Sequence, residues 1–249
     1  MIASWRRSLS WLCALLALAA LGLLVSGPLG WRMGWWHYST AFETLLPWAG
    51  YVGIAALAAA AISLVASLAG GGRGALLMAL AGLLAGAIAI CMPWQAASTR
   101  GVYPRINDIT TDTADPPAFA AVLAQRKSDG GNEGRYNAAS AVEQKKSYAD
   151  IAPVKAALGP AEAFKRASET AAAMPGWRVV ASDAAAGRIE ASQASRWFGF
   201  TDDVVIRVNA DGAGSRIDVR SASRYGRGDF GVNAARLRAY LSALAARLK

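Results

Sequence analysis

The sequence predicts three transmembrane helices followed by an α+β domain, in which a five-stranded antiparallel sheet carries two helices on one face. Charges divide the chain, because residues 1–94 hold four of its 26 Lys and Arg and one of its 17 Asp and Glu, and the rest lie in residues 95–249. The first part contains three apolar runs of membrane-spanning length. In the second part, strand and helix patterns follow the order β-α-β-β-β-β-α.

The apolar runs cover about Leu9–Leu29, Leu45–Ala69 and Ala75–Trp94. Each is long enough to cross a hydrocarbon core of ~30 Å, which requires roughly 20 residues. The first run follows two arginines, as in a cleaved signal peptide, but its apolar core is long and no Ala-x-Ala cleavage site stands out. We therefore expect a retained helix, with cleavage as the alternative.

Basic residues beside the runs predict the orientation. Arg6, Arg7 and Arg73 favour the cytoplasmic side for the N-terminus and the second loop, against Arg32 in the first loop. Three crossings then place residues 95–249 outside the cytoplasm. The expected location is a bacterial inner membrane with a periplasmic C-terminal domain.

The first loop, residues 30–38, is rich in Trp and Tyr, which favour the headgroup level of a bilayer. A ligand cage or quinone site that uses His37 is the functional alternative. Gly82 and Gly86 form a Gly-x-x-x-Gly pattern, which permits close helix packing within the three-helix unit.

We expect three regions: the membrane part (1–94), an exit segment with a short helix and a long loop (95–150), and the α+β domain (151–249). Asp115 precedes Pro116-Pro117 and suits the N-cap of a short helix that ends near Ala124. Residues 128–147 are rich in Gly, Asn, Ser and Lys and predict a surface loop. The elements expected in the third region are the strand Pro153–Leu158, the helix Pro160–Ala173, the strands Trp177–Ser182, Gly187–Ser195, Asp203–Asn209 and Ser215–Ser223, and the helix Phe230–Arg247.

Strand alternation assigns side chains to the two faces of the sheet. Toward the helices we place Ile189, Ala191, Val204, Ile206, Val208, Ile217 and Val219. On the opposite face we place Arg188, Glu190, Arg207, Arg216, Asp218 and Arg220. That face is either solvated, with cross-strand ion pairs worth ~1 kcal/mol or less, or a surface for phospholipid heads or acidic glycans.

The stretch from Arg220 to Asn233 joins the last strand to the last helix and is the densest polar cluster in the chain. Free N–H groups at a helix start, together with arginines, can hold an anion. Asp229 is suited to cap the same N–H groups. A structural cap is the favoured interpretation, which leaves Arg224 and Arg227 for a ligand.

Two groups of carboxylates suggest other chemistry. Asp108, Asp112 and Asp115 offer oxygens to a divalent cation, but the Gly and terminal Glu of an EF-hand loop are missing. Asp202 and Asp203 suggest an acid–base pair, although neighbours in a strand point to opposite faces. Both cysteines and the single histidine precede residue 95. A thiol nucleophile, a Ser-His-Asp triad and the usual His/Cys zinc site are therefore excluded after that residue.

Several motifs occur together in the second part: Asn107–Asp112, Asp115–Phe119, Gly187–Ala191, Phe198–Val204 and Asp218–Asn233. In this order they resemble the bacterial family called domain of unknown function 1499, over roughly residues 103–248. The resemblance implies a membrane-associated extracytoplasmic domain and no particular reaction. The positions that match the family's motifs are Asp108, Thr110, Thr111, Asp112, Asp202, Asp203, Arg220, Ser221, Ser223, Arg224, Gly226, Arg227, Asp229, Gly231 and Asn233.

We expect an integral inner-membrane protein without a cofactor or metal, whose periplasmic domain binds an anionic lipid, a glycan or an envelope protein. Nucleic acid is not expected outside the cytoplasm. The alternatives are a carboxylate-based periplasmic hydrolase or transferase and an assembly module of an envelope complex. The candidate ligand-binding residues are Asp108, Thr110, Thr111, Asp112, Asp202, Asp203, Arg220, Ser221, Ser223, Arg224, Arg227, Asp229 and Asn233. A single site requires that the two motif clusters, Asn107–Asp112 and Arg220–Asn233, lie in one pocket.

Overall fold

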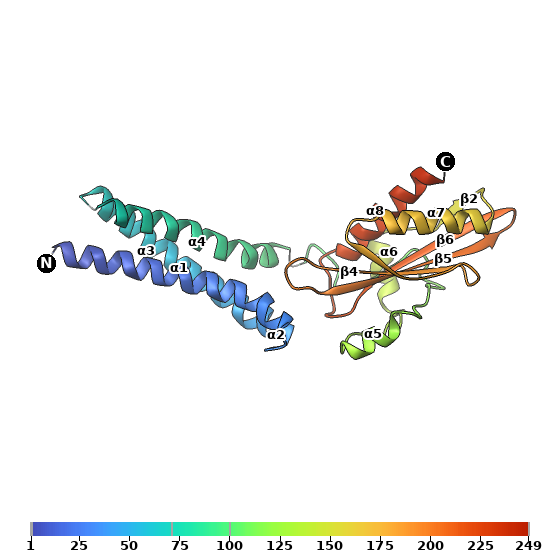
Figure 1. Ribbon diagram of the computed structural model, residues 1–249, viewed down its shortest axis with the longest axis horizontal. Coiled ribbons are helices and arrows are strands. Elements are labelled where there is room, and N and C mark those ends of the chain that lie inside the picture. Colours follow the sequence, from blue (N-terminus) through green and yellow to red (C-terminus); the bar gives the residue numbers. More distant parts are fainter. Residues whose placement is uncertain (1, 71, 100, 249) are drawn as a thin grey trace. The chain divides into compact units, whose positions relative to one another are not determined.

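A computed structural model describes residues 2–70, 72–99 and 101–248. The chain divides into two compact units, one formed by residues 1–100 with 197–199 and the other by residues 101–196 with 200–249. Figure 1 shows the first unit as helices and the second as a sheet with helices.

Among the residues that the structure describes, the first unit contains three helical regions that are long and apolar enough to cross a membrane: Trp5–Arg32, Tyr38–Leu68 and Arg73–Gln95. Its elements are α1 (Ile2–Arg32), α2 (Tyr38–Thr40), the π-helical turn η1 (Ala41–Leu45), α3 (Leu46–Leu68) and α4 (Arg73–Ser98). The first and third predicted runs fall within these regions, and the second, Leu45–Ala69, extends one residue beyond its region. Composition and length therefore identified the helices correctly.

Small residues bring these helices together. A Cβ on Gly86 would lie 2.8 Å from the carbonyl oxygen of Gly53, and one on Gly82 would lie 2.2 Å from Sγ of Cys13. The Gly-x-x-x-Gly pattern thus serves packing within the unit, as expected. His37 has a local contact, because its Nδ1 lies 3.0 Å from Oγ of Ser39 at the start of α2.

Within residues 101–248, the second unit is built on a six-stranded antiparallel sheet. Its strands are β1 (Asp108–Thr110), β2 (Val154–Ala156), β3 (Trp177–Asp183), β4 (Arg188–Ala194), β5 (Thr201–Asp211) and β6 (Gly214–Ser223). Its helices are α5 (Leu123–Ser128), α6 (Ser140–Ser147), α7 (Pro160–Ala173) and α8 (Val232–Arg247). The strand order is β1-β6-β5-β4-β3, and β2 pairs with β6 beyond β1. The five predicted strands correspond to β2–β6, and β1 is the additional one.

Two predictions in the segment before residue 150 were wrong. Residues 116–120 are not helical, and the short helix α5 begins at Leu123. The backbone N–H groups of residues 120–122 instead donate to the Glu190 carboxylate. The predicted surface loop contains α6, which is fixed by Gln144, whose side chain bonds both the N–H and the carbonyl oxygen of Thr110.

One face of the sheet packs against α7 and α8, as the alternation predicted. The buried cluster there includes Ile189, Ile206 and Ile217 from the strands and Leu237 and Tyr240 from α8. Burial of such side chains stabilises the fold by about 1.5–3 kcal/mol each. This face is therefore the main hydrophobic core of the second unit.

The opposite face is neither fully solvated nor an open basic surface, because Glu190, Asp218 and Arg220 are buried. The expected cross-strand ion pair does form, between Arg207 and Asp218 at 3.2 Å. Residues 112–137, here called the cover segment, lie across it and include α5, which Figure 1 shows on the side of the sheet away from α7 and α8. Phe119 and Val122 of this segment form a buried cluster with Val205 and Ala222 of the sheet. Glu190, Asp218 and Arg220 are consequently buried between two layers, whereas Arg188, Arg207 and Arg216 remain partly exposed.

Candidate functional site

The joint between β6 and α8 is capped by Asp229. Its Oδ1 accepts the N–H of Gly231 at 2.9 Å and its Oδ2 accepts the N–H of Asn233 at 2.7 Å. Asp229 thus caps N–H groups at the start of α8 as predicted, but it is not the N-cap residue: that position is Gly231, and the helix begins at Val232 rather than Phe230. Burial raises the pKa of Asp229, and the two N–H groups only partly offset that effect. The carboxylate therefore occupies the donors that an anion would need.

A hydrogen-bond network lies under the start of α8. Ser221 Oγ donates to Asn233 Oδ1 at 2.5 Å, and Asn233 Nδ2 donates to Ser223 Oγ at 2.9 Å. Arg236 joins this network and bonds Asp202 Oδ2 at 2.6 Å. Sequence reasoning missed Arg236, although its spacing of three residues from Asn233 places both on one helical face. These groups connect α8 to the sheet.

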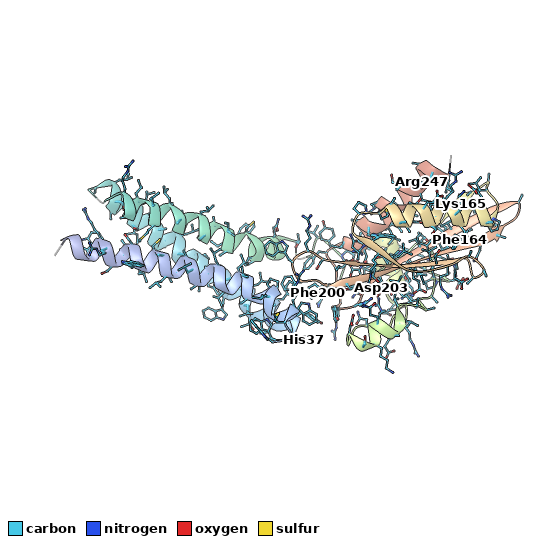
Figure 2. The ribbon with its side chains drawn as sticks, viewed as in Figure 1. His37, Phe164, Lys165, Phe200, Asp203 and Arg247 are labelled. Atoms are coloured by element: carbon cyan, nitrogen blue, oxygen red, sulfur yellow. The ribbon has the colours of Figure 1, made fainter. Side chains whose placement is uncertain are left out.

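Asp203 lies on the other side of the sheet, under the cover segment (Figure 2). Its Oδ2 accepts Nη1 of Arg126 at 2.7 Å, and both its oxygens accept bonds from Arg224 at 2.8 and 2.9 Å. Ser192 Oγ donates to it at 2.6 Å. Asp202 and Asp203 thus point to opposite faces, as predicted, and do not form a pair.

Arg220 forms the second ion pair beneath the cover segment. Its Nε and Nη2 donate to the two oxygens of Asp108 at 2.8 and 2.7 Å. Its other bonds reach the carbonyl oxygens of Pro117 and Gly134, and the Phe119 ring lies 4.8 Å from its guanidinium carbon. One arginine therefore joins β1, β6 and both halves of the cover segment.

The third group lies at the other end of the cover segment. Asp112 Oδ2 accepts Nη2 of Arg216 at 2.6 Å, and Thr111 Oγ1 donates to Asp218 Oδ1 at 3.3 Å. Burial raises the pKa of Asp112, but the N–H groups of residues 114 and 115 and the nearby arginines outweigh it, so this pKa lies below its usual range. Thr110 Oγ1 bonds the backbone of Asp112.

The three aspartates that suggested a cation site do not converge on one point. Asp108 binds Arg220, Asp112 binds Arg216, and Asp115 binds Arg207 at 2.8 Å. Each carboxylate therefore neutralises a different arginine of the sheet.

One cleft of about 410 Å³ brings together residues from both predicted clusters. Asn107 Nδ2 donates to the carbonyl oxygen of Gly226 at 2.8 Å. This bond joins the residue before β1 to the turn between β6 and α8. The lining residues are Arg105, Ile106, Asn107, Asp108, Arg126, Asn132, Gly134, Arg135, Asn137, Ser140, Ala222, Ser223, Gly226 and Arg227. Of the predicted ligand-binding residues, Asp108, Ser223 and Arg227 line this cleft, and the other ten lie outside its lining.

The side chains that line the cleft carry more positive than negative charge. Arg126 is paired with Asp203, and Asp108 is paired with Arg220. Arg105 and Arg227 are exposed, and among the residues that the structure describes neither has a carboxylate within ion-pair distance. Arg135 is also exposed and has only a 4.0 Å contact with the exposed Glu133. Three guanidinium groups are thus left for a ligand.

The fold and the cleft define a class of protein: three helices of membrane-spanning length and an α+β unit with a layered antiparallel sheet. Within that class, the chain belongs to the family described as protein of unknown function DUF1499, which matches residues 108–244. The match spans more than half of the chain and includes every strand from β1 to β6. No curated protein and no solved structure matches the chain significantly.

Proposed function

We propose that this is an integral protein of a bacterial inner membrane, with its N-terminus in the cytoplasm and its second unit in the periplasm. The second unit binds an anionic component of the cell envelope in the cleft. Support for the orientation comes from Arg6, Arg7 and Arg73, which favour the cytoplasmic side. The proposal for the cleft depends on the charges of its lining.

The observation that carries the proposal is the division of the arginines into two groups. The buried ones, such as Arg126, Arg220 and Arg224, are each paired with a carboxylate. Of the exposed arginines that line the cleft, Arg105 and Arg227 have no such partner in the described residues, and Arg135 has only the 4.0 Å contact with Glu133. Guanidinium groups bind phosphate and carboxylate through paired, charge-assisted hydrogen bonds. An anionic group is therefore the ligand that this cleft fits.

The pairing of Asp202 and Asp203 with arginines favours a binding function over carboxylate-based hydrolysis. A general base must reach the proton that it abstracts. Asp203 is 0% exposed and is held by Arg126 and Arg224. Asp202 is held by Arg236. These carboxylates serve the scaffold.

The test uses the full-length protein in nanodiscs of zwitterionic lipid, with glycerol phosphate and glucuronate as soluble probes. Isothermal titration calorimetry at low salt should detect binding of at least one probe, with weaker binding at higher salt because exposed charges are screened. Replacing both Arg105 and Arg227 by Gln should weaken binding by about 1.5–3 kcal/mol, or about 10-fold to 150-fold in Kd.

Arg178→Gln is the matched control, because Arg178 is an exposed arginine on β3, outside the lining of the cleft. This variant should bind as the wild type does. The proposal is rejected if neither probe binds at low salt, or if Arg178→Gln weakens binding as much as the cleft variant.

A further inference from the structure

A group of exposed apolar side chains lies beside the cleft. Val102, Tyr103, Phe230 and Val232, here called the apolar corner, have exposed fractions of 66%, 40%, 50% and 48%. Tyr103 adjoins Phe230 and Val232 in space, because a Cβ on Gly231, which lies between those two residues, would be 2.7 Å from the Tyr103 ring. Val102 precedes Tyr103 in the chain. Exposed apolar groups in contact with one another indicate an interaction surface more strongly than isolated ones do.

Phe230 combines an exposed ring with an unusual backbone conformation. Phe230 has a φ of 54°, and in the described residues it is the one residue other than glycine with a positive φ. This region is unfavourable for a bulky side chain. Such conformations persist where the surrounding structure imposes them, and they concentrate at functional sites.

Arginines of the cleft adjoin this corner. A Cβ on Gly228 would lie 3.5 Å from the Cα of Arg105, so the segment that carries Tyr103 and Arg105 packs along the turn that carries Arg227 and Phe230. Apolar rings next to arginines are typical of surfaces that lie at the interface of a lipid bilayer.

The length of the connecting chain brings the corner within reach of the membrane. Helix α4 ends at Ser98, and Val102 follows four residues later. Extended chain spans at most about 3.6 Å per residue, so Val102 lies within about 14 Å of the end of the helix. Headgroup regions extend roughly 5–8 Å beyond the hydrocarbon core on each side. The exposed Trp94 in α4 suits the same interface.

We propose that the apolar corner inserts into the headgroup layer of the membrane that holds the three helices, and that the cleft beside it takes the phosphate of an anionic phospholipid. This inference rests on the proposed function and names the ligand of the same cleft. A soluble anion would require the arginines but would leave the exposed rings in water, whereas a phospholipid headgroup layer satisfies both.

The test places an environment-sensitive fluorophore at the corner of the full-length protein. Phe230→Cys is labelled with NBD after Cys13 and Cys91 are replaced by Ala, and the protein is reconstituted in nanodiscs with and without phosphatidylglycerol. The control is Ala213→Cys in the β5–β6 hairpin, since the eleven residues of β5 separate that hairpin from the corner by about 35 Å.

At position 230 the emission should shift to shorter wavelength and be quenched by doxyl-labelled lipid, more strongly with phosphatidylglycerol. At position 213 neither effect is expected. Hydrogen exchange of the wild-type protein gives a second readout that needs no substitution: residues 102–105 and 226–232 should exchange more slowly with phosphatidylglycerol.

The inference is overturned if position 230 resembles position 213 in both lipids and exchange at the corner is unchanged. If glycerol phosphate still binds through Arg105 and Arg227 in that case, the proposed function stands and only the lipid assignment fails. Insertion that does not depend on phosphatidylglycerol rejects the anionic headgroup as the ligand.

Discussion

Neutralising Asp203 should strongly destabilise the second unit. This residue is fully buried and accepts hydrogen bonds from Arg126, Arg224 and Ser192. Asp203→Asn keeps the size of the side chain and removes its charge. Arg224 retains Asp129 as a partner. Among the described residues, Arg126 is then left with hydrogen bonds to the carbonyl oxygens of residues 132, 222 and 223 and with no carboxylate partner.

Removing one partner of a buried ion pair costs about 3–5 kcal/mol, because the remaining charge stays out of water without compensation. Each 1.36 kcal/mol corresponds to a factor of ten, so amide hydrogens of β5 and β6 that exchange by unfolding should exchange about 150-fold to 5,000-fold faster. Hydrogen exchange with mass spectrometry on the full-length protein in nanodiscs measures this difference.

Asp150→Asn is the matched control, since Asp150 also forms a paired contact with an arginine, Arg238, but both of these side chains are exposed to solvent. An exposed pair contributes at most about 1 kcal/mol, so exchange in β5 and β6 should change by less than about tenfold. The reasoning is refuted if Asp203→Asn accelerates exchange by less than tenfold, or if the two substitutions have equal effects.

Two further predictions concern the same scaffold. Arg220→Lys should lose the paired contact with Asp108 and the bonds to the cover segment, at a cost of about 2–3 kcal/mol; exchange in β1 and β6 should then accelerate, and unchanged exchange would contradict the assigned role. Burial raises the pKa of Asp229 in the folded protein above its unfolded-state value of about 3.9. The protonation of Asp229 therefore stabilises the folded state most below about pH 3.9, and this stabilisation is lost as pH rises through the folded-state pKa. Asp229→Asn keeps an oxygen for the cap, and its Tm relative to the wild type should therefore increase from about pH 4 to about pH 7; a relative Tm that decreases over this range would show the sign to be wrong.

The periodic parts of the fold could be predicted from the sequence. The helix Pro160–Ala173 was located correctly because a Gly-Pro pair begins it and a Pro-Gly pair follows it. The strands β3–β6 were found within two residues at each end, and their alternation gave the correct face for Ile206 and Ile217. The local sequence pattern is therefore enough to predict a helix or strand when one face of that element is apolar.

The cover segment could not be predicted in the same way. Its position depends on contacts far apart in the sequence, such as those between Arg126 and Asp203 and between Asp108 and Arg220. Alternation assigns a side chain to a face but does not say what lies over that face. One signal was available, because Val205 and Ala222 alternate with the charged residues there, and an apolar pair in the middle of a charged face indicates that another layer covers it.

The same contacts change how the family's motif positions are interpreted. Asp203, Arg220, Arg224 and Asn233 are buried in ion pairs or hydrogen bonds that hold the layers together. A substitution at these positions would reduce any activity by unfolding the second unit, so lost function there would not locate a ligand site. Arg227 differs from these residues because it is exposed in the cleft. Comparing Arg227→Gln with Arg224→Gln therefore separates the two roles: the first should weaken anion binding with unchanged exchange in β5 and β6, and the second should accelerate that exchange.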